Sequence, residues 1–239
     1  MRFNRPSIIF CATQRSGSTM IVDDFQNLTG CAESETEAFY HLAIDKGIQS
    51  WGKALDIVER HRIGEVIFFD KVMFPFLPIL SRMIAPEAGA MNTDPFAEFF
   101  ADAIWVYVRR ANIFEQTVSK YTAEKLGIWD TAKASEGFNA AMEFDVNVAL
   151  EYMRGFIEEE AQWLVFFRQH GISPIQIYYE DAVPNFPHYL APVLSAAGLK
   201  IDLAKARPRR KQKLGNARSV VLAEVLESMV QRDLIRLLF

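Results

Sequence analysis

The chain has 239 residues, of which 50% are hydrophobic, and its formal net charge is −4. This length and composition suit one hydrophobic core and do not require a second, so a single domain is expected over residues 1–239. Apolar runs stay below the roughly 18 residues that a membrane-spanning helix needs, and the weak net charge favours neither a nucleic acid nor an anionic membrane as partner. A cytoplasmic protein with no integral membrane segment is therefore expected.

Four short runs of β-branched and aromatic residues are apolar along most of their length, as buried parallel strands are. These runs lie at residues 7–13, 65–71, 103–109 and 174–179. Runs with helical periodicity lie between these strands and stop near a glycine, at residues 18–29, 113–125 and 146–170. A further amphipathic run, at residues 220–238, is expected to close the core.

The alternation of strands and helices predicts a three-layer α/β/α fold, P-loop-like, with a central, mostly parallel sheet. In such folds ligands bind beyond the carboxyl ends of the strands, and the polar motifs of this sequence lie at those ends. The weakly periodic stretch at residues 127–144 is either a plain connector or a lid over that site.

The first predicted strand leads into the segment TQRSGST at residues 13–19 and then directly into a helix. A loop of small residues at a helix start offers backbone N–H groups and the positive end of the helix dipole to an anion. Gly17 lets the backbone approach closely, and Arg15 adds a forked set of donors suited to phosphate or sulfate oxygens. Further hydroxyl donors come from Ser16, Ser18 and Thr19. The segment therefore predicts a phosphate-binding loop.

This loop differs from the triphosphate-binding loop of kinases and GTPases. That motif, G-x-x-x-x-G-K-[ST], needs a lysine just before its final hydroxyl residue, whereas here Ser18 stands between Gly17 and Thr19. A nucleotide-dependent kinase with a variant phosphate loop stays an alternative, and the missing lysine argues against it.

The order of strand, TQRSGST and helix resembles the donor loop of the sulfotransferase superfamily. The Gln-Arg pair within it resembles the bacterial branch typified by trehalose 2-sulfotransferase. The resemblance implies that residues 15–19 bind the 5′-phosphosulfate of the donor PAPS, of which PAP is the product. It also implies that Arg15 stabilises the negative charge that builds on the departing phosphate oxygen.

A second motif begins where the third predicted strand ends in YVRR, followed by ANIFEQTVSKY. The sulfotransferase family uses an arginine and a helical serine at this place for the 3′-phosphate of PAPS, and the resemblance implies Arg110 and Ser119. One extra residue separates the arginines from the serine here, so Arg109 stays an alternative. Gln116 also matches a family position.

The resemblance implies a general base in the segment AESETEAFYH. Transfer to a hydroxyl requires a group that takes the acceptor's proton opposite the leaving group. Glu37, just ahead of Phe39 and Tyr40, fits the family position best, and Glu35 is the rival. Lys71, in FFDKVMF, resembles a family lysine that holds the acceptor or steadies the sulfuryl oxygens, although a strand-end lysine reaching solvent is an equal alternative.

Residues 205–218 carry seven basic and no acidic side chains. They form a disordered linker, a nucleic-acid patch or, as the resemblance favours, a loop that folds over the 3′-phosphate and adenine of the donor. Among the later aromatic side chains, Trp129 is expected in the core. Tyr179, Glu180 and Asp181 are expected to brace the end of the fourth strand.

Taken with the resemblance, the motifs predict a PAPS-dependent sulfotransferase that acts on a hydroxyl of a carbohydrate or glycolipid. A non-catalytic nucleotide-binding protein is the second alternative. The histidines show no metal-binding spacing, and two cysteines are too few to staple this fold, so neither a metal nor a disulfide is predicted. A homodimer is expected from the resemblance alone.

Overall fold

The computed structural model describes residues 6–30, 37–48, 50–58, 62–63, 67–127, 129, 143–210 and 217–238. Within them a five-stranded sheet has the order β2-β3-β1-β4-β5. The parallel strands are β1 (Ser7–Ala12), β3 (Ile67–Met73), β4 (Ile104–Arg109) and β5 (Ile175–Tyr178). The edge strand β2 (Arg62–Ile63) is antiparallel to β3. It was not predicted, because two residues are too short to show a strand period.

The central strand β1 is buried along its whole length. Its side chains alternate between two cores: Ile9 and Cys11 join one apolar cluster, and Ile8, Phe10 and Ala12 join the other. A strand covered on both faces must be apolar at every position, which is the pattern that the sequence shows. The thiol of Cys11 is free and buried, and burial raises its pKa.

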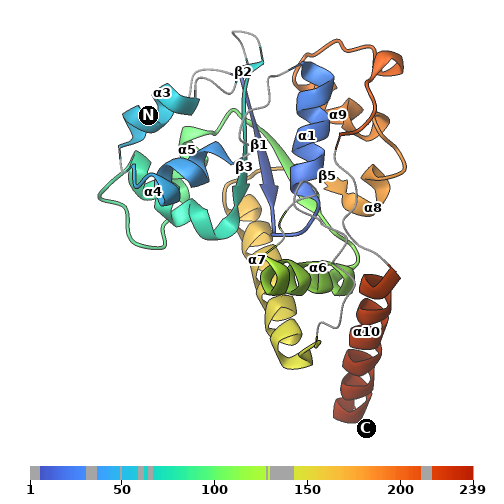
Figure 1. Cartoon of the computed structure of the whole chain (residues 1–239). Helices are drawn as coiled ribbons and strands as arrows, with labels where there is room; N and C mark the ends of the chain where they lie inside the picture. Colours follow the sequence, from blue (N-terminus) through green and yellow to red (C-terminus); the bar gives the residue numbers. More distant parts are fainter. Residues whose placement is uncertain are drawn as a thin grey trace.

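Helices cover both faces of the sheet (Figure 1). One face carries α1 (Ser18–Thr29), α8 (Tyr179–Ala182) and α9 (Ala191–Ala196). The other carries α2 (Ala38–Tyr40), α3 (Trp51–Val58), α4 (Leu77–Ile84), α5 (Asp94–Phe99) and α7 (Val146–Gln169). The predicted three-layer α/β/α fold with a mostly parallel sheet is confirmed.

The remaining elements lie beyond the carboxyl ends of the strands or connect the layers. They are α6 (Ile113–Leu126), α10 (Ala217–Leu238), the π-helix η1 (His41–Asp45) and the 3-10 turns η2 (Phe74–Phe76), η5 (His188–Leu190) and η6 (Leu203–Lys205). The predicted stops of α1 and α6 at Gly30 and Gly127 are confirmed, since both glycines are the C-caps of these helices. In the described part of the chain, no helix is both long and apolar enough to span a bilayer.

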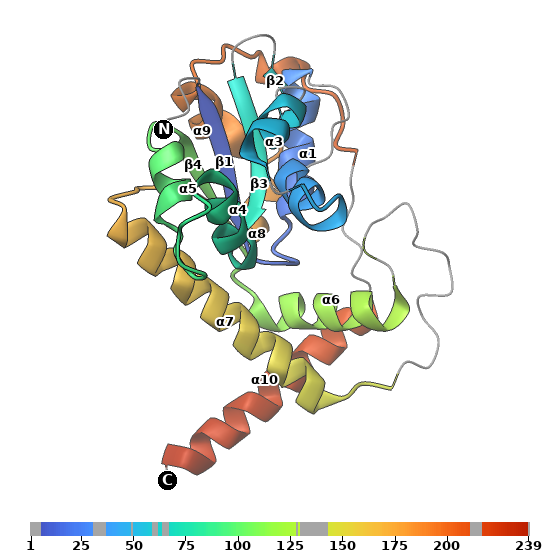
Figure 2. The same cartoon turned by 90° about the vertical axis from the view of Figure 1, so that its left-hand side faces the viewer.

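The prediction that the C-terminal helix closes the core is wrong. Figure 2 shows α10 extending away from the sheet, beyond α6 and α7. It packs on α6, and Leu226 is buried with Tyr121 and Ala149 in a small cluster separate from the two cores that flank the sheet. An amphipathic pattern indicates that one helix face is buried, but it does not say which element buries it.

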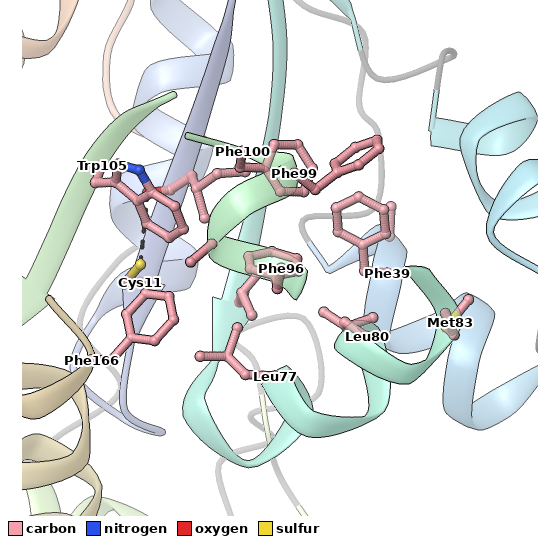
Figure 3. Packing of buried hydrophobic residues seen from close by; sticks show 14 of the residues in the cluster. Cys11, Phe39, Leu77, Leu80, Met83, Phe96, Phe99, Phe100, Trp105 and Phe166 are labelled. Atoms are coloured by element: carbon pink, nitrogen blue, oxygen red, sulfur yellow. Dashed lines mark hydrogen bonds between the residues drawn. The ribbon is translucent and has the colours of Figure 1, made fainter. Parts of the chain in front are cut away.

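An aromatic cluster fills the core between the sheet and α2 to α5 (Figure 3). Phe39 lies in it, with its ring stacked on Trp51 at 5.1 Å and edge-on to Phe68 at 5.7 Å and Phe100 at 6.0 Å. Aromatic contacts of this kind add to the free energy of burial. Because Phe39 is fixed in the core, the residues just before it are held near the sheet.

Candidate active site

The carboxyl ends of β1, β3 and β4 meet at one edge of the sheet, where Ala12 pairs with Met73 on one side and Val108 on the other. The chain leaves β1 there and turns through Arg15 and Gly17, which have φ angles of 61° and 88°. Left-handed residues in a tight turn direct backbone N–H groups toward one side and create an anion-binding concavity. The first turn of α1 adds N–H groups that have no partner within the helix.

The hydroxyl groups of this loop lie inside the protein. Ser16 is fully buried, and its Oγ has no hydrogen-bond partner among the described residues. Ser18 is 3% exposed. A buried hydroxyl without a partner costs free energy, so such a group calls for an explanation. An anion bound in the turn would accept this hydrogen bond, and the residues present therefore fit a phosphate or sulfate group.

Side chains of helix α6 donate hydrogen bonds to the start of the loop. Gln116 Nε2 donates to Thr13 Oγ1 at 2.8 Å and to the carbonyl oxygen of Gln14 at 2.7 Å. Lys120 Nζ donates to Gln14 Oε1 at 2.6 Å. Gln116 matches a family position for which the sequence indicates no role. Its position explains it as the residue that fastens the loop to α6.

Tyr179 closes the loop on the side of Gly17. A Cβ atom at Gly17 would lie 2.1 Å from Tyr179 Cδ2, so only glycine fits between the backbone and the ring. The Arg110 guanidinium carbon lies 4.8 Å from the centroid of the same ring. Tyr179, just after β5, thus contacts both the loop and Arg110 at the end of β4.

Arg15 and Ser119, which were predicted from separate motifs, are in direct contact. Arg15 Nε donates to Ser119 Oγ at 3.0 Å, and Arg15 Nη1 donates to the carbonyl oxygen of Trp129 at 2.9 Å. Burial and then the positive charge of Arg110 lower the pKa of Arg15 from its ordinary value. An anion placed between these two arginines would relieve both effects.

The two adjacent arginines at the end of β4 have different partners. Arg109 Nη1 donates to Tyr178 Oη at 2.9 Å, and its Nη2 lies 2.8 Å from Glu160 Oε2 on α7. Arg110 Nη1 instead donates to the carbonyl oxygen of Arg15 at 3.3 Å. Of the two alternatives that the sequence left open, Arg110 is therefore the one in contact with the loop.

Two carboxylates surround Arg110. Its Nη2 lies 2.7 Å from Glu115 Oε2, and its Nε lies 3.8 Å from Glu180 Oε1. Glu180 also accepts hydrogen bonds from the backbone amides of Ala111 and Asn112, at 2.9 and 3.2 Å. Glu180 was expected to stabilise the end of the fourth predicted strand. Its contact with Arg110 was not predicted.

Glu37, Lys71 and Thr19 form a connected polar chain beside the loop. Lys71 Nζ donates to Thr19 Oγ1 at 2.8 Å and lies 2.8 Å from Glu37 Oε1. Lys71 is 3% exposed and Glu37 is 24% exposed, so the lysine does not reach into bulk solvent and the carboxylate stays accessible. The alternative of a solvent-facing Lys71 is wrong. Glu35, the rival for the base, lies outside the described residues.

A buried carboxylate on β3 was missed. Asp70 is 1% exposed and accepts hydrogen bonds from the backbone amides of Ala38 and Phe39, both at 3.0 Å. Burial raises its pKa to about 7, against the lowering effect of these bonds. An aspartate within the apolar run IFFDKVM is rare enough to have signalled a buried polar contact.

Two other expectations meet the structure only in part. The expectation that Trp129 lies in the core is wrong, since it is 45% exposed, and the Lys120 ammonium lies 4.8 Å from the centroid of its ring. In the basic segment, Arg209 binds Asp24 at 2.9 Å and Arg210 binds Asp23 at 3.0 Å, both on α1. Residues 211–216 and most of the suggested lid at 127–144 lie outside the described residues.

Comparison with known proteins decides the family. The model of a family described as Stf0 sulphotransferase matches residues 57–224, more than half of the chain. The chain belongs to the Stf0 sulphotransferase family. The match includes Lys71, Arg110 and Ser119, and it begins after the loop at residues 13–19.

Two further similarities extend over more of this Stf0 sulphotransferase. A trehalose 2-sulfotransferase of Mycobacterium tuberculosis (strain ATCC 35801 / TMC 107 / Erdman) is 24% identical over 243 residues, which cover 87% of this chain and 90% of that protein. Among solved structures, the sulfotransferase domain from the Synechococcus PCC 7002 olefin synthase aligns with a TM-score of 0.47 and 14% identity, over 95% of this chain and 96% of that domain. The family and the curated relative identify the chain as a sulfotransferase.

Replacing Gly17 with alanine is expected to destabilise the protein more than the same change at Gly30. Both glycines have positive φ, so both variants incur a similar backbone cost of about 1 kcal/mol. Only at Gly17 does the new methyl group meet Tyr179, which adds roughly 1–3 kcal/mol. Urea unfolding measures the difference between the variants. Equal losses at the two positions would show that the ring does not confine the loop.

The free energy of unfolding is expected to fall as the pH rises from about 4 to about 7. Burial raises the pKa of Asp70 to about 7, of Glu159 to about 7 and of Asp24 to about 6. Each group then binds its proton more tightly in the folded protein, so its stabilising effect is complete below about pH 4 and is lost by about pH 7.

Urea unfolding at a series of pH values checks this trend. Asp70→Asn should flatten part of the slope, whereas Asp102→Asn, at an exposed position, should leave it unchanged. An unfolding free energy that rises with pH over this range would show that these carboxyl groups are ionised in the folded protein.

Proposed function

We propose that this sulfotransferase transfers a sulfuryl group from PAPS to a hydroxyl of a carbohydrate or a glycolipid. The proposal rests on the contact between the two predicted motifs. Arg15 of the loop donates to the Ser119 hydroxyl, and Arg110 donates to the backbone carbonyl oxygen of Arg15. A loop with a buried unpaired hydroxyl and an adjacent arginine–serine pair suits a ligand with two separate phosphate groups. The trehalose 2-sulfotransferase of Mycobacterium tuberculosis supports a carbohydrate acceptor.

The donor loop would hold the sulfated end of PAPS, which when bound supplies the activated sulfuryl group. Backbone N–H groups of residues 17–19 and the Ser16, Ser18 and Thr19 hydroxyls would donate to the 5′-phosphate and the sulfuryl oxygens. The cation of Arg15 would stabilise charge on the phosphate oxygen as the S–O bond to it breaks. Arg110 and Ser119 would hold the 3′-phosphate.

Glu37 would take the proton of the acceptor hydroxyl while that oxygen forms its bond to sulfur. Its accessible carboxylate and its ion pair with Lys71 place it beside the loop, and its exposure leaves room for an incoming hydroxyl. Lys71, which links Glu37 to Thr19, would contact the sulfuryl oxygens as they pass from donor to acceptor. The products are PAP and the sulfate ester, and the proton ends on the Glu37 carboxyl group.

PAP is expected to bind in isothermal titration calorimetry, and Arg110→Ala is expected to weaken that binding by more than Arg109→Ala. A charged hydrogen bond to a phosphate contributes about 1.5–3 kcal/mol, so loss of Arg110 should raise the Kd on the order of tenfold or more. Arg109 faces Glu160 and Tyr178 and is the matched control. Absence of PAP binding at high micromolar concentration would overturn the donor assignment. Magnesium-dependent binding of ATP instead would favour the kinase alternative.

Glu37→Gln is expected to lower kcat by about 10²–10⁴-fold while the Kd for PAP stays unchanged, because the amide cannot accept the acceptor's proton. The assay follows transfer of labelled sulfate from PAPS to trehalose and to a panel of other sugars and glycolipids. Glu35→Gln is the matched control. Normal turnover of Glu37→Gln together with loss in Glu35→Gln would move the base to Glu35. PAP binding without turnover on any acceptor would favour a non-catalytic nucleotide-binding protein.

A further inference from the structure

The segment that carries Glu37 lies across the edge of β3. Neighbouring side chains of a strand point to opposite faces of the sheet, and here Asp70 and Lys71 are such neighbours. Asp70 reaches the backbone of Ala38 and Phe39, whereas Lys71 reaches the side chain of Glu37. Residues 37–39 are therefore contacted by side chains from both faces of the strand. The described strand β2 pairs with β3 only at Ile67 and Phe68, which leaves this part of the edge to the segment.

Asp70 supplies the helix cap that Glu37 does not supply. Glu37 is the N-cap residue of α2, and its side chain makes no capping hydrogen bond. The two oxygens of Asp70 accept one N–H each, Oδ1 from Ala38 and Oδ2 from Phe39, at 3.0 Å. An N-cap side chain, most often that of Ser, Thr, Asp or Asn, ordinarily accepts from the second or third N–H group of its helix. Because Asp70 accepts from the second, at Phe39, the Glu37 carboxylate is left to face Lys71 at 2.8 Å.

We propose that Asp70 is a positioning residue, whose carboxylate holds the backbone at Ala38 and Phe39 so that Glu37 faces Lys71 and the donor loop. This inference rests on the proposed function, in which Glu37 is the base. The side-chain hydrogen bonds of Asp70 go to the backbone of the segment that carries Glu37, so it acts through Glu37. The ring of Phe39, buried in the aromatic core, anchors the other side of the same segment.

Asp70→Asn is the sharpest change, because it keeps the shape of the side chain. A carboxylate accepts at both oxygens, whereas an amide has one oxygen and an NH₂ group that cannot accept, so one of the two backbone N–H groups loses its partner. Ser81→Ala is the matched control. Ser81, on α4, is also buried, and its Oγ accepts from the backbone amide of Phe96 at 3.3 Å within the same aromatic core, not from the backbone of residues 37–39.

The first measurement is amide hydrogen exchange at Ala38 and Phe39, followed by NMR at about pH 8, where Asp70 is ionised. Asp70→Asn should raise the exchange rate of at least one of these amides on the order of tenfold, and Ser81→Ala should leave both unchanged. Unchanged exchange in Asp70→Asn overturns the proposal, and this result does not depend on any enzyme activity. If Asp70→Asn does not fold, Asp70→Ser, with a smaller neutral side chain, replaces it.

The second measurement is a double-mutant cycle in the sulfate-transfer assay with PAPS and trehalose. Asp70→Asn should lower kcat on the order of tenfold with little change in the KM for PAPS, and it should cause no further loss when Glu37→Gln is already present. Ser81→Ala should keep normal turnover. Equal losses in both backgrounds would overturn the proposal and assign Asp70 a general structural role. Absence of transfer by the wild-type protein would refute the proposed function, while the exchange experiment would still decide whether Asp70 holds the segment.

Discussion

The left-handed turn at Arg15 and Gly17 is the constraint on which the rest of the site depends. It is stabilised from three directions, by Gln116 of α6 below, by the ring of Tyr179 at its side and by Arg110 on its carbonyl group. These contacts oppose the conformational cost of a positive φ at a residue other than glycine. The turn in this conformation directs its backbone N–H groups and the buried Ser16 hydroxyl toward one place.

The charged and hydroxyl side chains around the turn lie in two groups. Arg15, Arg110 and Ser119 lie toward β4 and α6, where a nucleotide phosphate suits them. Lys71 and Glu37 lie toward β3 and meet the loop at Thr19. A donor that enters from one side and a hydroxyl that enters from the other would meet above α1.

Features encoded by neighbouring residues could be predicted from the sequence. The four parallel strands, the ends of α1 and α6 and the turn between β1 and α1 depend on local periodicity, glycine and small polar residues. The choice between Arg109 and Arg110 could not be predicted, because it depends on which face of β4 each side chain takes at the end of the strand. Asp70 was missed for a related reason, since its partners lie 31 and 32 residues away along the chain. The packing partner of α10 likewise depends on contacts that no local pattern encodes.

The central claim is that the turn at residues 15–19 binds the sulfated end of an adenosine bisphosphate donor. A crystal structure of the protein with PAP tests it most directly. The account predicts the 5′-phosphate about 3 Å from the backbone N–H groups of the turn and from Ser16 Oγ, with the 3′-phosphate beside Arg110 and Ser119. A nucleotide bound elsewhere, with Ser16 Oγ still unpaired, would contradict it.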